Sequence, residues 1–372
     1  MLLSALQDDL LKLSDEARFR ELSPQNGVDF SSNDYLGLAG SRRLADAVTR
    51  AIDAGVPVGS GGSRLLRGNH PEHELLETEA AAFFKTARTL FFSSGFAANM
   101  TLLSTLPQRD DLVIYDALIH ASAHEGMKLS RAKIVEIPHN DASAVEDAIV
   151  RWRQTGATGR PWIVVESLYS MGGDAAPLEA LADIASKHDA MLIIDEAHAT
   201  GVFGEQGRGL SDRLHDRENI ISLHTCGKAL GCEGALVCGP KIACDFLINR
   251  GRGFIFSTAP SPLMASAVRE SLHILADEPK RRIELRSNID LAERVLAPFG
   301  VESTGSQILP LFVGENERTM KIAQHLQGSG FDIRGIRPPT VPHGTARLRI
   351  SLTLNVSKDE IKQLGNALEL AL

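Results

Sequence analysis

Three residues with acid, imidazole and amine side chains follow short apolar runs in this chain. Met191–Ile194 leads directly into Asp195 and His198, and Ile220–Leu223 leads into Lys228. Such runs predict strands buried on both faces, and open α/β sheets bind ligands at the carboxyl ends of their strands. A pyridine-aldehyde cofactor needs a lysine for its Schiff base and an acid that keeps the ring nitrogen protonated. The three residues therefore predict a site for pyridoxal phosphate (PLP).

Two alternatives for these residues are weaker. The string Asp195–His198 also occurs in nucleic-acid helicases, which need a G-x-x-x-x-G-K-[ST] phosphate loop. This chain lacks that loop, because Gly227-Lys228 is not followed by serine or threonine. The other alternative is an acid that caps a loop and a lysine in solvent. An unpaired charge directly after four apolar residues is costly, however, and Gly227 and Gly231 let the backbone turn tightly against a ligand.

A second group of residues suits a phosphate. Ser94–Phe96 follows a strand expected at Thr89–Phe92 and opens an expected helix. The first N–H groups and the positive dipole end of a helix attract an anion, although a plain serine N-cap explains this segment equally well. Thr225, three residues before Lys228, offers a hydroxyl to the same phosphate. Gly59–Arg64 has no preceding strand and lacks the G-x-G-x-x-G order, which argues against a dinucleotide site.

The histidine and cysteine spacings favour no metal. His120 and His124 have the i, i+4 spacing of two zinc ligands, but no third ligand is recognisable. His120 better suits an aromatic platform over a flat cofactor, because it closely follows the strand expected at Leu112–Tyr115. The cysteines at 226, 232, 238 and 244 include no C-x-x-C pair, and Cys238 lies in an apolar run typical of a buried thiol. Structural disulfides are not expected in a cytosolic chain.

Length, charge and the N-terminal residues limit the class of protein. The chain has 372 residues, 43% of them hydrophobic, and a formal net charge of −8. This length predicts one large and one smaller domain. The acidic balance without a basic cluster argues against nucleic acid as a partner. Asp8 and Asp9 come too early for a signal peptide, and no apolar run approaches the roughly 20 residues of a membrane helix. We therefore expect a cytoplasmic enzyme.

The elements that must position these residues alternate between strands and helices. Apolar runs separated by amphipathic helical patterns predict an α/β fold with a mostly parallel, seven-stranded sheet. The expected strands are Thr89–Phe92, Leu112–Tyr115, Lys133–Ile137, Trp162–Glu166, Met191–Asp195, Ile220–Leu223 and Ala235–Cys238.

The pattern changes in the last third of the chain and predicts a smaller α+β domain. Its expected strands are Gln307–Val313, Phe331–Ile336 and Arg347–Leu352, with helices at Lys280–Leu296, Met320–Gln327 and Lys358–Leu372. We expect residues 41–279 to form the large PLP-binding domain and residues 280–372 the small C-terminal domain. Residues 1–40 are too few for a core of their own and are expected to pack on the small domain.

Ordered segments along nearly the whole chain resemble the α-oxoamine synthases, which have the type I, aspartate-aminotransferase-like PLP fold. The resemblance runs from about Phe30 to Thr353. The segments that carry it are Ser32–Leu38, Gly59–Arg64, Ser94–Asn99, Asp195–Val202 and Gly204–Gly209. At two positions the chain departs from many relatives: Cys226 replaces Phe or Leu, and Glu233 replaces Ser.

The resemblance implies a role for each matching residue. Lys228 would hold PLP and, once released, act as a general base, with His120 stacked on the ring. Asp195 would pair with the ring nitrogen and His198 with the ring oxygen. The family also implies a homodimer with shared active sites. Its further cofactor contacts would be Gly95, Phe96, Ser170 and Thr225, with Thr258 reaching the phosphate of the neighbouring subunit.

The segments Ile336–Pro342 and Gly344–Arg349 indicate the substrates. They most resemble family members of biotin biosynthesis that condense L-alanine with a pimeloyl thioester, on CoA or on a carrier protein, and release CO2. Arg337 matches the arginine that receives the amino-acid carboxylate, a task suited to a bidentate guanidinium. Further substrate contacts would be Asn33, Thr340 and Arg18, with Arg20 as a second counterpart of Arg18. A sister synthase that uses glycine or another acyl-CoA, and an aminotransferase on the same fold, remain alternatives.

Overall fold

The chain folds into two compact units. The computed structural model describes residues 3–22, 24–214 and 217–372. Unit 1 comprises Met1–Tyr35, Ser170–Asp174 and Ile283–Leu372, and unit 2 comprises Leu36–Tyr169 and Ala175–Arg282. This division differs from the predicted domains in that residues 36–40 and 280–282 belong to unit 2. Residues 170–174, expected in the large domain, cluster instead with unit 1.

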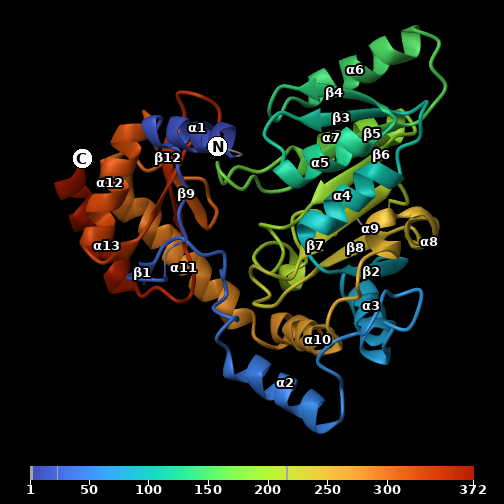
Figure 1. Cartoon of the computed structure of the whole chain (residues 1–372), viewed down its shortest axis with the longest axis horizontal. Helices are drawn as coiled ribbons and strands as arrows, with labels where there is room; N and C mark the ends of the chain where they lie inside the picture. The colour runs from blue at the N-terminus through green and yellow to red at the C-terminus, as the bar shows by residue number, and fades with distance from the viewer. Residues whose placement is uncertain (1–2, 23, 215–216) are drawn as a thin grey trace. The chain divides into compact units, whose positions relative to one another are not determined.

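Unit 2 is built on a seven-stranded sheet in the order β2-β8-β7-β6-β5-β3-β4 (Figure 1). β8 is antiparallel to both of its neighbours, whereas β7, β6, β5, β3 and β4 are parallel to one another. The mostly parallel α/β sheet predicted from the apolar runs is therefore confirmed. The strands are β2 (Arg88–Phe92), β3 (Leu112–Asp116), β4 (Lys133–Ile137), β5 (Pro161–Glu166), β6 (Met191–Asp195), β7 (Ile220–Thr225) and β8 (Ala235–Gly239).

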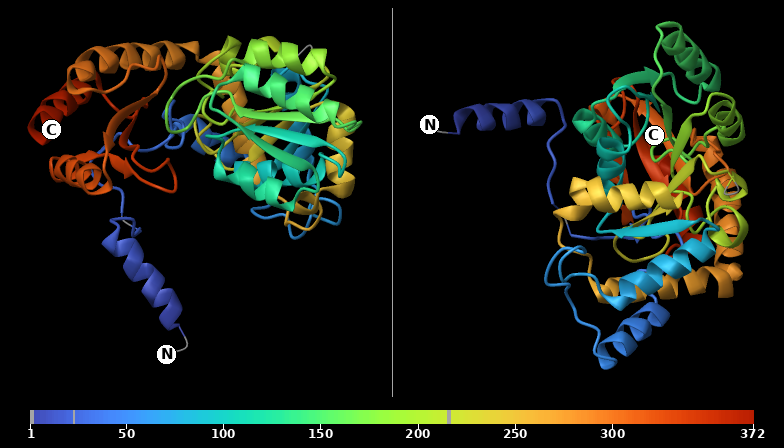
Figure 2. Two further views of the ribbon diagram at one scale, coloured as in Figure 1. Left: turned by 90° about the horizontal axis from the view of Figure 1, so that it is seen from above. Right: turned by 90° about the vertical axis from the view of Figure 1, so that its right-hand side faces the viewer.

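Helices cover both faces of this sheet, which is why its central strands are apolar at consecutive positions (Figure 2). One core joins the sheet to α4 (Gly95–Thr105), α5 (Ala121–Leu129), α8 (Lys241–Arg250) and α9 (Arg252–Ile255). The core on the opposite face contains α6 (Ala142–Gln154) and α7 (Leu178–Lys187). The parallel strands β3, β5, β6 and β7 all end at one edge, and α4 begins after β2 ends. The chemistry-bearing residues at these strand ends are thereby gathered at one edge.

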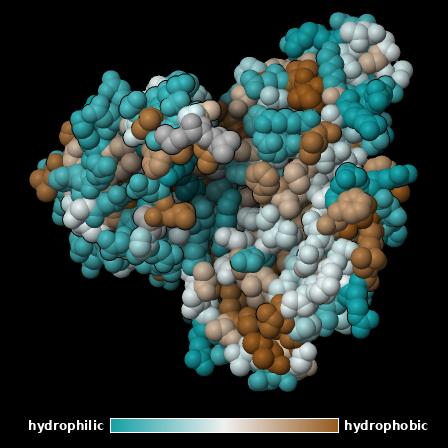
Figure 3. Space-filling model, in the orientation of Figure 1, coloured by the Kyte–Doolittle hydropathy of each residue, from teal (hydrophilic) through white to brown (hydrophobic). Residues whose placement is uncertain are grey.

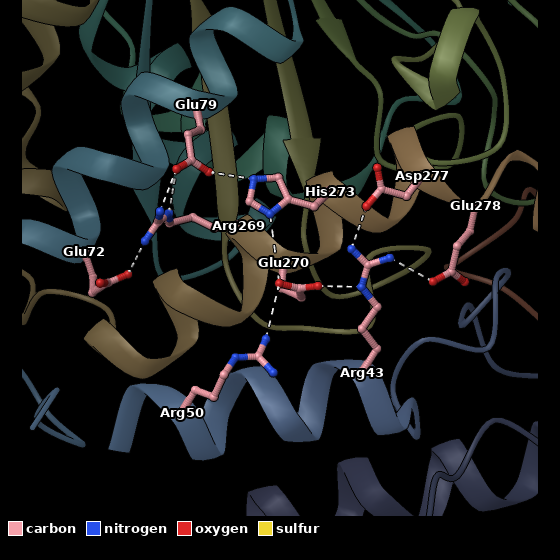
Figure 4. Close-up of polar contacts among 9 residues, drawn as sticks. All are labelled: Arg43, Arg50, Glu72, Glu79, Arg269, Glu270, His273, Asp277 and Glu278. Carbon is pink, nitrogen blue, oxygen red and sulfur yellow. Dashed lines mark hydrogen bonds and ion pairs between the residues drawn. The ribbon is translucent and has the colours of Figure 1, made fainter. Parts of the chain in front are cut away.

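A charged network joins three helices of unit 2 (Figure 4). Arg43, on α2 (Arg42–Asp53), donates hydrogen bonds to Glu270 in the middle of α10 (Pro262–Asp277), to Asp277 at its end and to Glu278 just after it. These carboxylates, Asp277 above all, raise the pKa of the Arg43 guanidinium. Arg269 of α10 pairs in the same way with carboxylates of α3 (Pro71–Phe83). The network ties α2 and α3 to α10.

Unit 1 contains a three-stranded antiparallel sheet in the order β11-β12-β9 and a two-stranded one, β1-β10. The strand predicted at residues 331–336 is two strands, because its first part pairs with β1 and its last part with β12. No helix in the described part of the chain has both the length and the apolar character to span a bilayer. The elements of unit 1 are α1 (Ser4–Asp15), β1 (Val28–Asp29), β9 (Ile308–Gly314), α12 (Asn316–Gly328), β10 (Phe331–Asp332), β11 (Arg334–Ile336), β12 (Ala346–Ser351) and α13 (Lys358–Ala371), with α11 (Pro279–Leu296) starting in unit 2.

Candidate active site

A cavity of about 180 Å³ lies at the carboxyl ends of the parallel strands of unit 2. It brings together seven of the residues predicted for the cofactor: Gly95, Phe96, His120, Asp195, His198, Thr225 and Lys228. Asn99, Ser122, Ala197, Leu223 and Glu166 complete its lining. Strand ends that are distant in sequence thus supply one site, as strand polarity predicts.

Lys228 and His198 meet inside the cavity. The Lys228 amine nitrogen lies 2.7 Å from Nε2 of His198. Lys228 lies in the turn that follows β7, where the Gly231 N–H donates to the Lys228 carbonyl at 2.8 Å. Gly231 has a positive φ of 64°, and a Cβ there would lie 2.5 Å from the Ala39 nitrogen, so only glycine fits this turn. The glycine predicted to allow a tight turn beside the lysine does so.

Asp195 ends β6 as a buried carboxylate with two fixed partners. Asn99, on α4, donates its amide N–H to Oδ2 at 2.7 Å, and the Ala197 backbone N–H donates to Oδ1 at 2.9 Å. These donors orient the carboxylate and offset part of the cost of burying it. Only 7% of Asp195 is exposed, and the residue lines the cavity, so a cationic ring nitrogen there would gain a charged partner.

His120 is held as a neutral ring at the start of α5. The Ser122 backbone N–H donates to Nδ1 at 3.2 Å, so Nδ1 is the acceptor and Nε2 carries the proton of the neutral tautomer. Burial lowers the pKa of His120, the positive charge of Lys228 lowers it further, and Asp195 opposes the shift. His124, the other half of the i, i+4 pair, packs its ring edge-on against Tyr115 at 5.2 Å. No cluster of three or more potential metal-binding side chains occurs among the described residues.

The start of α4 forms a seat for an anion. Ser94 caps the helix by accepting the Ala97 N–H at 3.1 Å. This cap leaves the N–H groups of Gly95 and Phe96 without a protein acceptor among the described residues. A Cβ on Gly95 would occupy the space 3.5 Å from the Thr225 hydroxyl, so glycine keeps that space open. Free N–H donors, a helix dipole and a hydroxyl together fit a phosphate group.

The cavity therefore fits PLP in its chemistry. The phosphate matches the α4 start and Thr225, the ring nitrogen matches Asp195, and the aldehyde matches Lys228. His120 provides an aromatic face. Each of these features comes from a different element, and each is directed into one cavity.

In unit 1 the segment that contains Arg337 and Thr340 contacts the segment that contains Arg18 and Arg20. The Arg337 guanidinium donates to the Ala17 carbonyl, and Arg18 donates to the Pro338 carbonyl at 3.1 Å. Arg20 donates to the Thr340 hydroxyl at 3.2 Å. Burial lowers the pKa of Arg337, and the charge of Arg20 lowers it further. The guanidinium groups of Arg20 and Arg337 add positive charge to this region of unit 1, whereas Arg18 pairs with Glu16 at 2.6 Å.

Arg349 is a residue that the sequence argument missed. Its guanidinium donates to the Ser170 carbonyl at 2.6 Å and to Oδ1 of Asn33 at 2.9 Å, and 6% of the residue is exposed. Asn33, predicted to work with Arg337, thus has Arg349 as its arginine partner, and Ser170 is likewise held in unit 1 by Arg349. Arg349 could have been noticed because it ends the segment Gly344–Arg349, which is one of the segments that resemble the family. The resemblance implied no role for this arginine.

The lining of the cavity differs from the prediction in two further ways. Thr258 is exposed and does not line it; its expected contact with a neighbouring subunit stays a prediction. Asn99 and Ser122 line it without having been predicted as site residues. Asn99 was inside the quoted segment Ser94–Asn99, and its place one helical turn after Gly95 was the signal that could have identified it.

Comparisons with known proteins show the family to which the chain belongs. The model of the family described as aminotransferase class I and II matches residues 25–368. A protein named putative 8-amino-7-oxononanoate synthase from Geobacillus kaustophilus is 40% identical over 92% of this chain and 88% of its own length. The 8-amino-7-oxononanoate synthase 2 of Bacillus subtilis is 38% identical over 93% of this chain and 88% of its own length.

Solved structures give the same fold. Serine palmitoyltransferase from S. paucimobilis, with a bound PLP–myriocin aldimine, has a TM-score of 0.90 and 26% identity, covering 100% of this chain and 98% of that one. The 8-amino-7-oxononanoate synthase of Francisella tularensis has a TM-score of 0.77 and 30% identity, covering 93% of this chain and 96% of that one. The higher TM-score and the higher identity thus belong to different enzymes of one fold.

Proposed function

The chain belongs to the aminotransferase class I and II family, within the group of PLP-dependent 8-amino-7-oxononanoate synthases, and we propose the reaction that it catalyses. L-Alanine condenses with a pimeloyl thioester to give 8-amino-7-oxononanoate, CO2 and a free thiol, a step of biotin biosynthesis. The observation that carries the proposal is the cavity in which Lys228, Asp195 and His120 converge, in a chain 40% identical to a protein of that name.

The cofactor supplies an electron sink for charge that develops at the amino-acid Cα when its proton leaves. Asp195, oriented by Asn99, keeps the pyridine nitrogen cationic through the charged hydrogen bond that it accepts. His198, which lies beside the Lys228 amine, would hold the ring hydroxyl oxygen of bound PLP. The N–H groups of Gly95 and Phe96, with the Thr225 hydroxyl, bind the phosphate.

Lys228 acts as the general base of the reaction. Its amine takes the proton from the Cα of alanine, and the alanine Cα then attacks the thioester carbonyl, which expels the thiol. The carboxylate of alanine leaves as CO2, and Lys228 returns a proton to the same carbon. Nε2 of His198 lies within hydrogen-bonding distance of the Lys228 amine. The imidazole therefore holds the amine in position between the two proton transfers.

His120 polarises the new ketone as CO2 departs. Because Nδ1 accepts the Ser122 N–H, the Nε2 N–H is free to donate to the ketone oxygen. A neutral ring also suits stacking against a cationic pyridine better than an imidazolium does. Its lowered pKa keeps the ring neutral at physiological pH.

Arginines of unit 1 bind the carboxylates of the substrates. Arg337 receives the carboxylate of alanine, with Asn33 and Thr340 as further contacts, and Arg18 lies near the acyl chain. Arg349, bonded to Asn33, is the second guanidinium suited to the alanine carboxylate. If Arg337 binds the alanine carboxylate, the Arg337→Ala variant shows a much larger increase in KM for alanine than the Arg349→Lys variant does. A larger increase in the Arg349→Lys variant would instead assign carboxylate binding to Arg349.

We infer a homodimer in which Thr258 reaches the cofactor phosphate of the partner subunit. Some large apolar side chains in unit 2 are exposed. Phe256, two residues before Thr258, is 70% exposed. Val58 and Leu66, which flank the glycine-rich segment Gly59–Arg64, are 75% and 85% exposed. Figure 3 shows a hydrophobic area on the lower part of unit 2 in that view. Exposed apolar surface of this kind supports a contact between protein chains.

A synthase that joins another amino acid to another acyl thioester is the second candidate. The TM-score of 0.90 to serine palmitoyltransferase favours it. A thiol-release assay with alanine, glycine and serine, each against pimeloyl, acetyl, succinyl and palmitoyl thioesters, separates the two. Pimeloyl-CoA and a pimeloyl carrier protein are compared in the same assay. We expect alanine with a pimeloyl thioester to give the highest kcat/KM; a higher value for any other pair contradicts the proposal.

A further inference from the structure

Two cysteines flank the lysine of the active site. Cys226 comes two residues before Lys228 and Cys232 four residues after it. Backbone hydrogen bonds close this loop at its base: the Cys232 N–H donates to the Cys226 carbonyl at 2.8 Å, and the Cys226 N–H donates to the Gly234 carbonyl at 2.9 Å. The two cysteines are therefore backbone neighbours, and the catalytic lysine lies between them.

The backbone geometry of this pair suits a disulfide. The hydrogen bond from the Cys232 N–H to the Cys226 carbonyl brings the two backbones together at this point, and a disulfide bridges Cα atoms roughly 4.4–6.8 Å apart. Cys226 is fully buried, and Sγ of Cys232 lies 3.4 Å from the Ser271 hydroxyl of α10. Burial, and then the Cys232 and Cys238 thiols, raise the pKa of Cys226, so the Cys232 thiol lies within electrostatic range.

The two thiols also differ in access to solvent. Cys232 is partly exposed, whereas Cys226, Cys238 and Cys244 are buried. Cys238 is occupied in the sheet, where its Sγ lies 3.3 Å from the Thr89 hydroxyl. A small oxidant thus reaches Cys232 before the other thiols, and Cys226 is the thiol joined to it by the backbone.

We propose that Cys226 and Cys232 form a reversible, redox-sensing disulfide that closes the lysine loop and suppresses turnover under peroxide. The peroxide O–O bond breaks, one oxygen transfers to Sγ of Cys232 to give a sulfenic acid, and the other leaves as water. Sγ of Cys226 then forms the S–S bond, the S–O bond breaks, and the Cys226 proton leaves with the hydroxyl as a second water. A dithiol reductant reverses the reaction.

The consequence for turnover rests on the proposed role of Lys228, whereas the disulfide itself does not. The turn that carries Lys228 is held by the hydrogen bond from the Gly231 N–H to the Lys228 carbonyl, and this turn lies wholly inside the loop 226–232. A covalent link at the base of the loop restricts the movement that Lys228 needs as it takes and returns its proton.

Peptide mapping tests the disulfide directly. The holoenzyme is treated with hydrogen peroxide, alkylated, denatured to free Lys228, and digested with trypsin without reduction. Cleavage after Arg217, Lys228 and Lys241 places the two cysteines on separate peptides, 218–228 and 229–241. We expect these peptides to be linked, with fragment ions that assign the bond to Cys232. Cys238→Ser, the matched control on the same peptide, keeps the link, and Cys232→Ser abolishes it.

The rate at which the same samples release free thiol from the pimeloyl thioester tests whether the disulfide suppresses turnover. Peroxide lowers the rate of the parent enzyme about tenfold, and dithiothreitol restores it to within about twofold. Cys232→Ser keeps its rate under peroxide, and Cys238→Ser behaves as the parent does. The proposal is overturned if all four thiols remain, if the link uses Cys238 or Cys244, or if Cys232→Ser loses activity like the parent. Finding the link in an enzyme that does not condense alanine would retain the disulfide and refute only the proposed function.

Discussion

Two of the cavities in unit 2 lie at opposite edges of its sheet, and the smaller of the two contains the candidate catalytic residues. The cavity of about 180 Å³ at the carboxyl ends of the strands contains Lys228 and Asp195. The other, about 870 Å³, is lined at the amino ends of β5, β6 and β7 by side chains such as Met191 and Ile220. Several of its charged side chains form ion pairs; Lys241, for example, bonds Asp245 at 2.6 Å.

The difference between the residues that line the two cavities follows from the direction of the strands. At the carboxyl edge, strand ends deliver polar side chains and α4 directs its first N–H groups into the same space. At the amino edge no described residue has an arrangement comparable to the Lys228–His198 and Asp195–Asn99 pairs. Convergence of oriented, buried ionisable groups, rather than cavity volume, therefore identifies the site. Because the two cavities share residue types, substitutions of the same kind can be compared between them.

The largest effect is expected at the lysine. Lys228→Ala lowers the rate of thiol release by at least about 10³-fold, because it removes both the cofactor link and the general base. Lys241→Ala, at the larger cavity, leaves the rate within about twofold. The measurement is kcat on both variants, with thermal unfolding to show that each is folded. Comparable losses in the two variants would remove the distinction between the cavities.

An intermediate effect is expected at the acid. Asp195→Asn keeps the shape of the side chain but loses the charge that keeps the pyridine nitrogen cationic, so kcat falls about 10²-fold. Asp189→Asn, at the larger cavity, has no such effect, since Asp189 pairs with Arg160 on the surface at 3.3 Å. Single-turnover rates of proton loss from alanine check the step concerned. An Asp195→Asn enzyme with the parent rate would show that the carboxylate does not support the cofactor ring.

A smaller effect is expected at the amide that orients the acid. Asn99→Ala removes the hydrogen bond to Oδ2 of Asp195, and kcat falls about tenfold while KM for alanine changes little. Asn219→Ala is the matched control, because Asn219 donates to the Ala190 carbonyl at 2.9 Å beside the larger cavity. If Asn99 is only structural, the loss in kcat will instead accompany a lower melting temperature and a parent-like pH profile.

The smallest effect is expected in the pH profile. Burial depresses the pKa of His120, so the ring stays neutral at pH values below the ordinary 6.5 or so at which an exposed histidine gains its proton. Lowering the pH from 7.5 to 6.5 therefore changes kcat by no more than about twofold through His120. Loss of activity through this ring occurs only at more acidic pH. The pH profiles of the parent and His120→Asn are compared; a limb at or above pH 6.5 present only in the parent contradicts the assignment.

The elements and the central site were predictable from the sequence because strand burial and strand polarity act locally. An apolar run such as Met191–Ile194 predicts a strand, and the residue after it must lie at the carboxyl edge. Asn99 and Arg349 were missed because their importance comes from partners distant in sequence: Asp195 is 96 residues from Asn99, and Asn33 is 316 residues from Arg349. The split of residues 331–336 into two strands likewise depends on which strands lie beside them.

The attachment of the cofactor to Lys228 is the central claim, and borohydride reduction tests it most directly. Reduction of the yellow holoenzyme makes the link between lysine and PLP permanent, and peptide mapping then locates it. The account predicts one pyridoxyl group per chain, on Lys228, with Lys241 and all other lysines unlabelled. A label on another lysine, or no label on an enzyme that is active in thiol release, would contradict it.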